Sequence, residues 1–318
     1  MKKTLFGNLL LLLAAMIWGF AFVAQVISVE SGIGAVSFNA IRFMLGALIL
    51  IPIILIFDRK KEDPSSRKRL LIGSTVSGLF LCLAANLQQI ALTVNANPGF
   101  AGFITALYTV WTPVAYFLIF RKKTAVSVWV AVAVSIAGFY LLCMTDGGGI
   151  SFGIDVVLLL ISTVFWTAQI LAVDYFVEGT SALKLSFGQY FVCAVISFVY
   201  AFIFEADTLT LTAIGGAKWS ILYCGIMSVG VAYTLQVVGQ KMTSPVFAVI
   251  IMSTESVFSA IGGLLWNLIV PISLHVDQNI STIGYVGCGV IFLGVVISQV
   301  DFSVFFSRRK GIHNETDI

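Results

Sequence analysis

The sequence predicts an all-α membrane protein with ten transmembrane helices, arranged as two inverted five-helix repeats. Hydrophobic residues make up 59% of the chain and charged residues 10%, whereas soluble domains contain about 45–50% and about 25%. The mean hydropathy is +1.03. Ten apolar runs are long enough to cross a bilayer, because a spanning helix needs ~20 residues at about 1.5 Å each to cover a ~30 Å hydrocarbon core.

These runs exceed the strands of a membrane barrel in length and lack strict alternation, so helices are favoured. The first run follows Lys2 and Lys3, as a signal peptide would, but it continues to Ile27 and is too long for a cleaved signal. The runs lie near residues 5–27, 34–57, 70–93, 98–120, 125–144, 152–174, 185–204, 218–240, 245–267 and 282–301.

The second half of the chain repeats the first about 147 residues later; for example, Leu87-Gln88 recurs as Leu235-Gln236. Each unit has five runs, an odd number, so the second unit would enter the bilayer from the opposite face. Inverted repeats of this kind are typical of secondary transporters, with the substrate site near the midplane. We expect a first repeat over 1–147, a second over 148–306 and a cytoplasmic tail over 307–318.

Lysine and arginine residues predict the orientation. Of the 18, all but Arg42 and Lys218 lie in the termini or in alternate loops. Cationic loops remain on the cytoplasmic side, so we expect a multi-pass protein of the cytoplasmic (inner) membrane with both termini in the cytoplasm. An even number of helices agrees with this. The basic residues serve topology, so no nucleic-acid partner is expected.

Motifs of enzymes and of ATP hydrolysis are absent from the sequence. It has no Gly-rich phosphate loop and no zinc-ligand cluster, and the five cysteines lie in apolar runs without metal-ligand spacing. We therefore expect no enzyme activity, no cofactor and no metal site.

Counting residues from two helix starts identifies a candidate central site. Pro98 and Pro245 open runs that start at opposite faces of the membrane. Tyr108 and Glu255 each lie ten residues farther along, roughly 15 Å into the bilayer, and Arg42 lies roughly 12 Å deep by the same count. A charge at the bilayer centre costs about 2.5–3.5 kcal/mol, so Arg42 should face the bundle interior or a cavity.

Glu255, Arg42 and Tyr108 form the predicted substrate or proton site. A poorly solvated carboxyl favours its neutral form, so Glu255 can exchange protons during transport. The alternative for Glu255 is a structural carboxylate that is locked to Arg42, at a similar depth, or to a helix hydroxyl. The alternative for Arg42 is a residue that holds helices together.

Further candidates surround this site. Gln88, near the outer end of its run, and Gln236, near the inner end of its own, are candidate gates at opposite mouths, with amides that hold helices together as the alternative. Aromatic residues at the observed spacing also occur in ordinary packing. The candidates for cavity lining are Trp18, Phe22, Trp166 and Gln169.

An ordered set of motifs resembles a known family. The motifs are Ile17-Trp18-Gly19, Phe38-Asn39-Ala40-Ile41-Arg42-Phe43, Asn86-Leu87-Gln88-Gln89, Val231-Ala232-Tyr233-Thr234-Leu235-Gln236 and Glu255-Ser256-Val257-Phe258. Their order resembles the EamA-type family of the drug/metabolite transporter superfamily over roughly residues 5–301. The resemblance implies a ten-helix carrier of two EamA units, often an exporter of amino acids, metabolites or drugs.

The chain departs from that family at two helix ends. Many members carry Gly-Glu at the cytoplasmic end of helix 4 and again at the end of helix 9. Here those places read Phe120-Arg121 and Trp266-Asn267. This leaves Glu255 as the main acidic candidate in helix 9.

Taken together, these features predict a secondary active transporter, an exporter of small metabolites, amino acids or drug-like compounds by alternating access. Its expected partners are a small-molecule substrate and the lipid bilayer; proton or cation coupling and a homodimer are left open. The alternatives are a non-transporting membrane helper subunit and an intramembrane enzyme. An enzyme should show a catalytic dyad or metal ligands at membrane depth, and the sequence offers neither.

Overall fold

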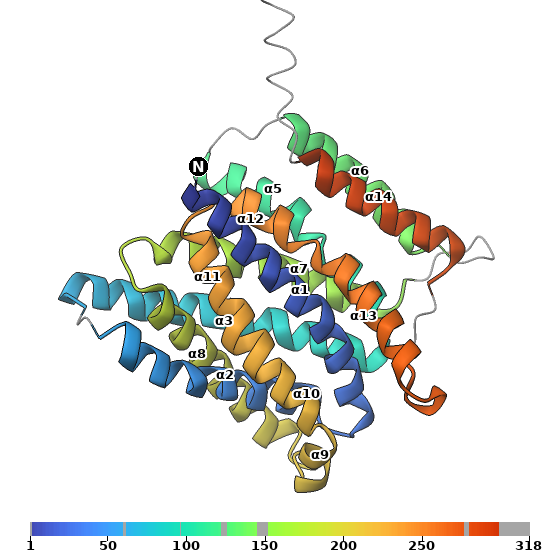
Figure 1. Ribbon diagram of the computed structural model, residues 1–318, viewed down its shortest axis with the longest axis horizontal. Helices are drawn as coiled ribbons and strands as arrows, with labels where there is room; N and C mark the ends of the chain where they lie inside the picture. The colour runs from blue at the N-terminus through green and yellow to red at the C-terminus, as the bar shows by residue number, and fades with distance from the viewer. Residues whose placement is uncertain are drawn as a thin grey trace, which may run out of the picture.

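The computed structural model, drawn in Figure 1, describes residues 2–59, 62–95, 97–121, 126–144, 152–276 and 280–298. Within these residues the chain forms helices and connecting loops and no strands. The expected all-α class is therefore confirmed. The predicted tail over 307–318 lies outside the described residues.

Helices follow each predicted apolar run. The first half of the chain contains α1 (Lys2–Glu30), α2 (Ala35–Phe57), α3 (Pro64–Val94), α4 (Pro98–Thr105), α5 (Tyr108–Phe120) and α6 (Val126–Leu142). The second half contains α7 (Ile154–Val177), α8 (Ala182–Phe204), α9 (Leu211–Gly216), α10 (Lys218–Leu222), the π-helix η1 (Tyr223–Tyr233), α11 (Thr234–Gln240), α12 (Pro245–Met252), α13 (Glu255–Ile269), the 3-10 turn η2 (Ile272–Leu274) and α14 (Thr282–Ser298).

Eight of the helical segments in the described part of the chain are long and apolar enough to cross a membrane. Two of the eight run through a bend, from α4 into α5 and from α12 into α13, and a third runs from α10 through η1 into α11. Helices α6 and α14 contain shorter apolar stretches, Trp129–Leu142 and Thr282–Gly294. The chain is therefore a multi-pass membrane protein.

The bends differ from the sequence prediction, which expected uninterrupted helices over 98–120 and 245–267. Helix α4 ends at Thr105 and α5 begins at Tyr108, and helix α12 ends at Met252 before α13 begins at Glu255. Proline and glycine, the usual causes of kinks, are absent from both junctions. The sequence therefore gave no sign of them.

Tightened turns produce both bends. At the first, the Leu107 N–H donates to the Ile104 carbonyl at 3.0 Å, and at the second the Thr254 N–H donates to the Ile251 carbonyl at 3.2 Å. These bonds span three residues and not four, which is the pattern of a 3-10 turn. The junction residues keep right-handed helical backbone angles, so the chain changes direction without unwinding.

Helices from the two halves pack against each other throughout the bundle. Helix α2 packs on α8, α6 on α14, α3 on α7 and α8, and α1 on η1, α11 and α13. Figure 1 shows the α6–α14 pair at one edge of the bundle, with α2 and α8 toward the opposite edge. The remaining helices lie between these two pairs and form the core.

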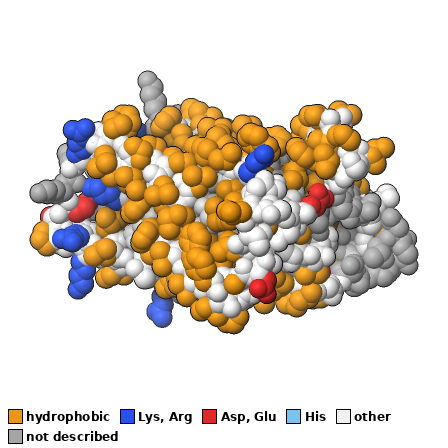
Figure 2. Space-filling model, turned by 90° about the horizontal axis from the view of Figure 1, so that it is seen from below, with side chains coloured by type: hydrophobic (Ala, Val, Ile, Leu, Met, Phe, Trp, Pro, Cys, Tyr) orange, Lys and Arg blue, Asp and Glu red, His pale blue; other side chains and the backbone are white. Residues whose placement is uncertain are grey.

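The outer surface is largely apolar. Side chains such as Phe57, Leu268 and Leu118 are 78%, 81% and 67% exposed. Figure 2 shows hydrophobic side chains over most of one face, with several Lys and Arg side chains gathered at one end of the molecule. Apolar surface of this extent is suited to lipid, and cationic residues at one end are suited to the membrane boundary.

Glycines allow α6 and α14 to approach closely. A Cβ atom at Gly138 would lie 2.6 Å from the Ile291 nitrogen, and one at Gly287 would lie 2.5 Å from the Leu142 nitrogen. Small residues at such contacts are typical of membrane helix pairs, where close backbone approach supplies the packing energy.

We expect Gly287→Ala to destabilise the protein, because the new methyl group would meet backbone atoms of α6. Overpacking of this kind costs about 1–3 kcal/mol. Gly289→Ala on the same helix is the matched control, since a Cβ there meets nothing within 4 Å. Thermal unfolding in detergent measures both variants, and equal melting temperatures would contradict this account of the α6–α14 contact.

Candidate functional site

A small cavity lies at the centre of the bundle. Its volume is about 40 Å³, and one water molecule needs about 10–15 Å³ by the same kind of measure. The cavity therefore has room for a few waters in this conformation. Eight of the residues predicted from the sequence line it: Glu255, Arg42, Tyr108, Trp18, Phe22, Trp166, Gln88 and Gln236.

The two bends place Tyr108 and Glu255 on this cavity. Tyr108 is the first residue of α5, and Glu255 is the first residue of α13. Both side chains therefore reach the cavity from the junction between two helical segments, one in each half of the chain.

Arg42 and Glu255 share the cavity but are not paired with each other. No nitrogen of Arg42 lies within 4.0 Å of a Glu255 carboxyl oxygen, so the ion pair considered from the sequence is not formed. Instead, the Arg42 guanidinium lies 5.4 Å from the ring centre of Phe38 and 5.1 Å from that of Phe43. These distances are typical of cation–π interactions.

Tyr108 lines the same cavity as Glu255. Its hydroxyl and the Glu255 carboxyl are close enough to interact electrostatically. Neither Tyr108 Oη nor Glu255 Oε1 makes a hydrogen bond, however. The alternative in which Glu255 is locked by a hydroxyl is therefore not what this conformation shows.

Five buried polar atoms on the cavity wall make no hydrogen bond. Buried polar groups are nearly always paired, and leaving one unpaired costs about 1–3 kcal/mol. This concentration of donors and acceptors suits a polar solute or water. The atoms are Trp18 Nε1, Arg42 Nε, Tyr108 Oη, Gln236 Oε1 and Glu255 Oε1.

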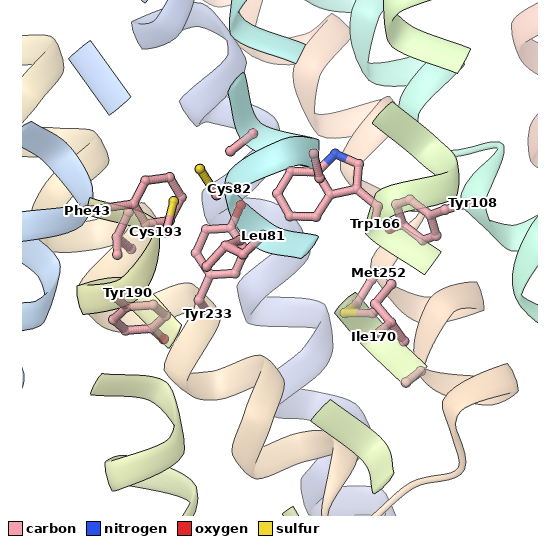
Figure 3. Packing of buried hydrophobic residues seen from close by; sticks show 14 of the residues in the cluster. Phe43, Leu81, Cys82, Tyr108, Trp166, Ile170, Tyr190, Cys193, Tyr233 and Met252 are labelled. Carbon is pink, nitrogen blue, oxygen red and sulfur yellow. The ribbon is translucent and has the colours of Figure 1, made fainter. Parts of the chain in front are cut away.

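Tyr233 is the centre of an aromatic cluster beside the cavity, and the sequence reasoning did not single it out. Its ring lies 4.7 Å from that of Trp18 and 5.9 Å from that of Trp166, with which it is stacked. In Figure 3 the Trp166 indole lies between the rings of Tyr233 and Tyr108. Tyr233 ends the π-helix η1, and π-helical segments are frequent at functional sites.

Gln88 links its own helix, α3, to three others at the cavity wall. Its side-chain oxygen accepts from Trp166 Nε1 at 3.0 Å and from Thr105 Oγ1 at 3.5 Å, and its amide nitrogen donates to Gln25 Oε1 at 3.4 Å. Gln25 and Thr105 also line the cavity, although sequence reasoning did not name them as site residues. This arrangement matches the alternative in which the amide holds helices together.

Gln236 belongs to a second amide chain. Its nitrogen donates to Gln169 Oε1 at 3.1 Å, and Gln169 Nε2 donates in turn to Gln189 Oε1 at 2.9 Å. Gln169 is thus buried behind the wall and is not among the residues that line the cavity. Gln88 and Gln236 both border this one cavity, whereas the sequence placed them at opposite mouths. Their role as gates stays a prediction.

The chain is similar in sequence to a known family and to a curated relative, and in fold to a solved structure. The model of the EamA-like transporter family matches residues 5–144 and 153–299. An uncharacterized transporter of Archaeoglobus fulgidus is 27% identical over 303 residues, which cover 93% of this chain and 86% of the relative. The match to a solved crystal structure covers 93% of this chain and 98% of the chain in that structure. Its TM-score is 0.62 at 16% sequence identity, so the two chains share the fold.

The fold and these matches define a membrane transporter. More narrowly, the chain belongs to the EamA-like transporter family. The family resemblance found in the sequence is thereby confirmed.

We expect Gln88→Leu to destabilise the protein, because Trp166 Nε1 would lose its acceptor inside the membrane. The expected loss is about 1–3 kcal/mol, measured by thermal unfolding in detergent. In a Trp166→Phe background the same change should lose less, since the donor is already gone. Equal losses in the two backgrounds would contradict the assigned bond.

Proposed function

We propose that this protein is a secondary active transporter that exports small amphipathic compounds across the cytoplasmic membrane. The observation that carries the proposal is the central cavity, where Arg42 and Glu255 meet aromatic side chains while neither is neutralised by the other. Ionisable side chains at membrane depth are expensive, and they typically mark substrate or proton paths. Both termini would lie in the cytoplasm.

Ten membrane spans in two inverted repeats, over 1–147 and 148–306, form part of this proposal. Helices α6 and α14 would be the two shorter spans. The helix contacts support the repeat: α3 packs on α7 as η1 and α11 pack on α1, while α2 packs on α8 and α6 on α14. Under the repeat, α1 would correspond to α7, and α3 to η1 with α11, so the first two contacts would be counterparts of each other. In the α2–α8 and α6–α14 pairs, the two partners would be each other's counterparts. The matching bends, each ten residues after a proline helix start, also support it.

Alternating access would then follow from the repeat, because exchanging the conformations of the two halves exchanges the open face. A cavity of about 40 Å³ is too small for a metabolite. The conformation described above would therefore be an intermediate that is closed to both faces.

The chemistry of the wall favours one kind of substrate. Trp18, Trp166 and Tyr233 offer flat apolar surface, Arg42 can hold an acidic group, and Glu255 can hold an ammonium group or a proton. A compound with an apolar body and small charged groups fits all three features. Nucleotides, with several phosphates, would leave most of their charge without partners.

We expect Glu255→Gln to abolish transport while leaving folded protein in the membrane. The amide keeps the shape of the side chain but can neither release a proton nor hold a cation. Proteoliposomes that contain the purified protein test this with labelled amino acids and small amphiphiles, with and without a pH gradient.

Asp207→Asn is the matched control for Glu255→Gln, because it neutralises an exposed carboxylate that does not line the cavity. It should transport like the wild type. Wild-type transport by Glu255→Gln would refute the role of this carboxyl. Purified wild-type protein that moves no member of the panel would favour a helper subunit over a carrier.

We expect Arg42→Gln to raise KM for compounds that carry an acidic group. The substitution introduces the residue found at the equivalent position of the second half, Gln189. Compounds with an acidic group should lose about tenfold or more in affinity, as removal of a charged hydrogen-bond partner predicts. Compounds without one should be affected little. Competition by paired analogues that differ only in the acidic group measures this, and an equal effect on both analogues would indicate a structural role for Arg42.

A further inference from the structure

Helices α2 and α8 are antiparallel, and each ends beside the start of the other. Asp58 follows the last residue of α2 and contacts Ser181, the residue that precedes α8. Glu205 follows the last residue of α8 and contacts Val36 and Ser37 in the first turn of α2. A carboxylate thus joins the two helices at each end of the pair.

At the start of α2, the Glu205 carboxylate provides the helix cap. The Val36 N–H donates to Oε1 at 3.2 Å, the Ser37 N–H donates to Oε2 at 2.7 Å, and the Ser37 hydroxyl donates to Oε2 at 2.9 Å. The capping position itself is Gly34, which has no side chain to offer. A Cβ atom there would overlap Glu205 Oε2, so glycine makes room for the incoming carboxylate.

At the start of α8, Asp58 acts through a serine and a lysine. The Ser181 hydroxyl accepts from the Lys184 N–H at 3.2 Å and donates to Asp58 Oδ2. The ammonium nitrogen of Lys184 lies 3.6 Å from Asp58 Oδ1 and 3.1 Å from Glu62 Oε1. The carboxylate again secures the first turn of the opposite helix.

Three pairs of positions at the two contacts correspond under the sequence repeat. Asp58 and Glu205 are 147 residues apart, and so are Gly34 and Ser181, and Ser37 and Lys184. This is the offset that relates the two halves of the chain. The contacts are therefore counterparts at opposite ends of the α2–α8 pair. We call them the Glu205 latch (Glu205, Val36, Ser37) and the Asp58 latch (Asp58, Ser181, Lys184).

The α2–α8 pair also reaches the cavity wall. Arg42, which lines the cavity, is on α2. Tyr190 on α8 lies 6.1 Å from Tyr233 between ring centres, and its hydroxyl is 3.1 Å from Thr234 Oγ1. Separation of the two helices at one end would therefore move wall residues of the cavity relative to each other.

We propose that the two latches are the gates of the transporter, and that each holds its own face of the α2–α8 pair shut. Charge-assisted hydrogen bonds are the strong ones among hydrogen bonds, and both latches are formed in this closed conformation. One latch must break, while the other remains, for the cavity to open to one side. The inference rests on the alternating access proposed above.

Sided thiol labelling tests the gates. Ser228 lines the cavity, so Ser228→Cys provides a reporter. None of the five native cysteines is among the cavity-lining residues. A membrane-impermeant maleimide reaches the outer face in intact cells and the inner face in inverted vesicles. Glu205→Gln should raise labelling at the outer face only, and Asp58→Asn at the inner face only. We expect roughly tenfold or more in each case, the effect of losing hydrogen bonds to a charged group.

Two exposed carboxylates provide matched controls. Asp207→Asn lies near the Glu205 latch and Glu178→Gln lies near the Asp58 latch, and neither side chain belongs to a latch. Both should label like the reporter protein alone, and latch variants without the reporter give the background. If Glu205→Gln does not fold, Ser37→Ala removes only the hydroxyl bond to Glu205. At the other latch, Ser181→Ala removes the bond to Asp58 together with the cap on the Lys184 N–H.

The outcomes separate the gates from transport itself. Labelling by the latch variants at the parent rate on both faces, or an increase at the wrong face, would overturn the gates. If wild-type proteoliposomes transport and labelling is unchanged, only the gate proposal fails. If labelling is sided as expected but wild-type protein moves no member of the substrate panel, the gates stand and the transporter proposal fails.

Discussion

Two ionisable side chains at membrane depth set a requirement that the rest of the structure meets. Arg42 and Glu255 are only 2% and 5% exposed, so neither faces lipid. A charge at the centre of the bilayer costs at least about 2.5 kcal/mol. The two side chains also do not neutralise each other. The surrounding helices must therefore supply the stabilisation, and for the guanidinium they do so with the aromatic rings of Phe38 and Phe43. A central polar cavity walled by aromatic rings is the result.

The bends between α4 and α5 and between α12 and α13 are how the backbone meets that requirement. All backbone polar groups must be satisfied inside the bilayer, so a helix cannot simply stop at mid-membrane. A tightened turn keeps its hydrogen bonds while it redirects the chain. Each new half-helix then begins at the cavity, with Tyr108 in one half of the protein and Glu255 in the other. The same local arrangement, used twice, places polar side chains at the centre of an apolar bundle.

Most of the framework could be predicted from the sequence, because hydropathy and length determine membrane helices and a fixed rise per residue determines depth. That arithmetic is why Tyr108, Glu255 and Arg42 were placed on one level and do border one cavity. Depth says nothing about rotation around a helix axis, however. The missing Arg42–Glu255 pair therefore could not be derived. Gln88 and Gln236 were assigned to opposite mouths from their depths, whereas one cavity wall includes both. Tyr233 was not predicted for a related reason. It is the last residue of the π-helix η1, which rotates its side chains relative to an α-helix, and no sequence motif indicates a π-helix.

The two halves differ most where a carrier of the proposed kind has least need of symmetry. Alternating access exchanges the roles of the two faces, so each end of the α2–α8 pair needs a closure of comparable strength. Glu205 and Asp58 occupy equivalent positions and achieve this by different routes, one directly on backbone N–H groups and one through Ser181. The central site, by contrast, is shared by both open states and is used from both sides. Arg42 opposite Gln189 can therefore be unequal without disturbing the exchange, and that inequality gives the site its chemical character.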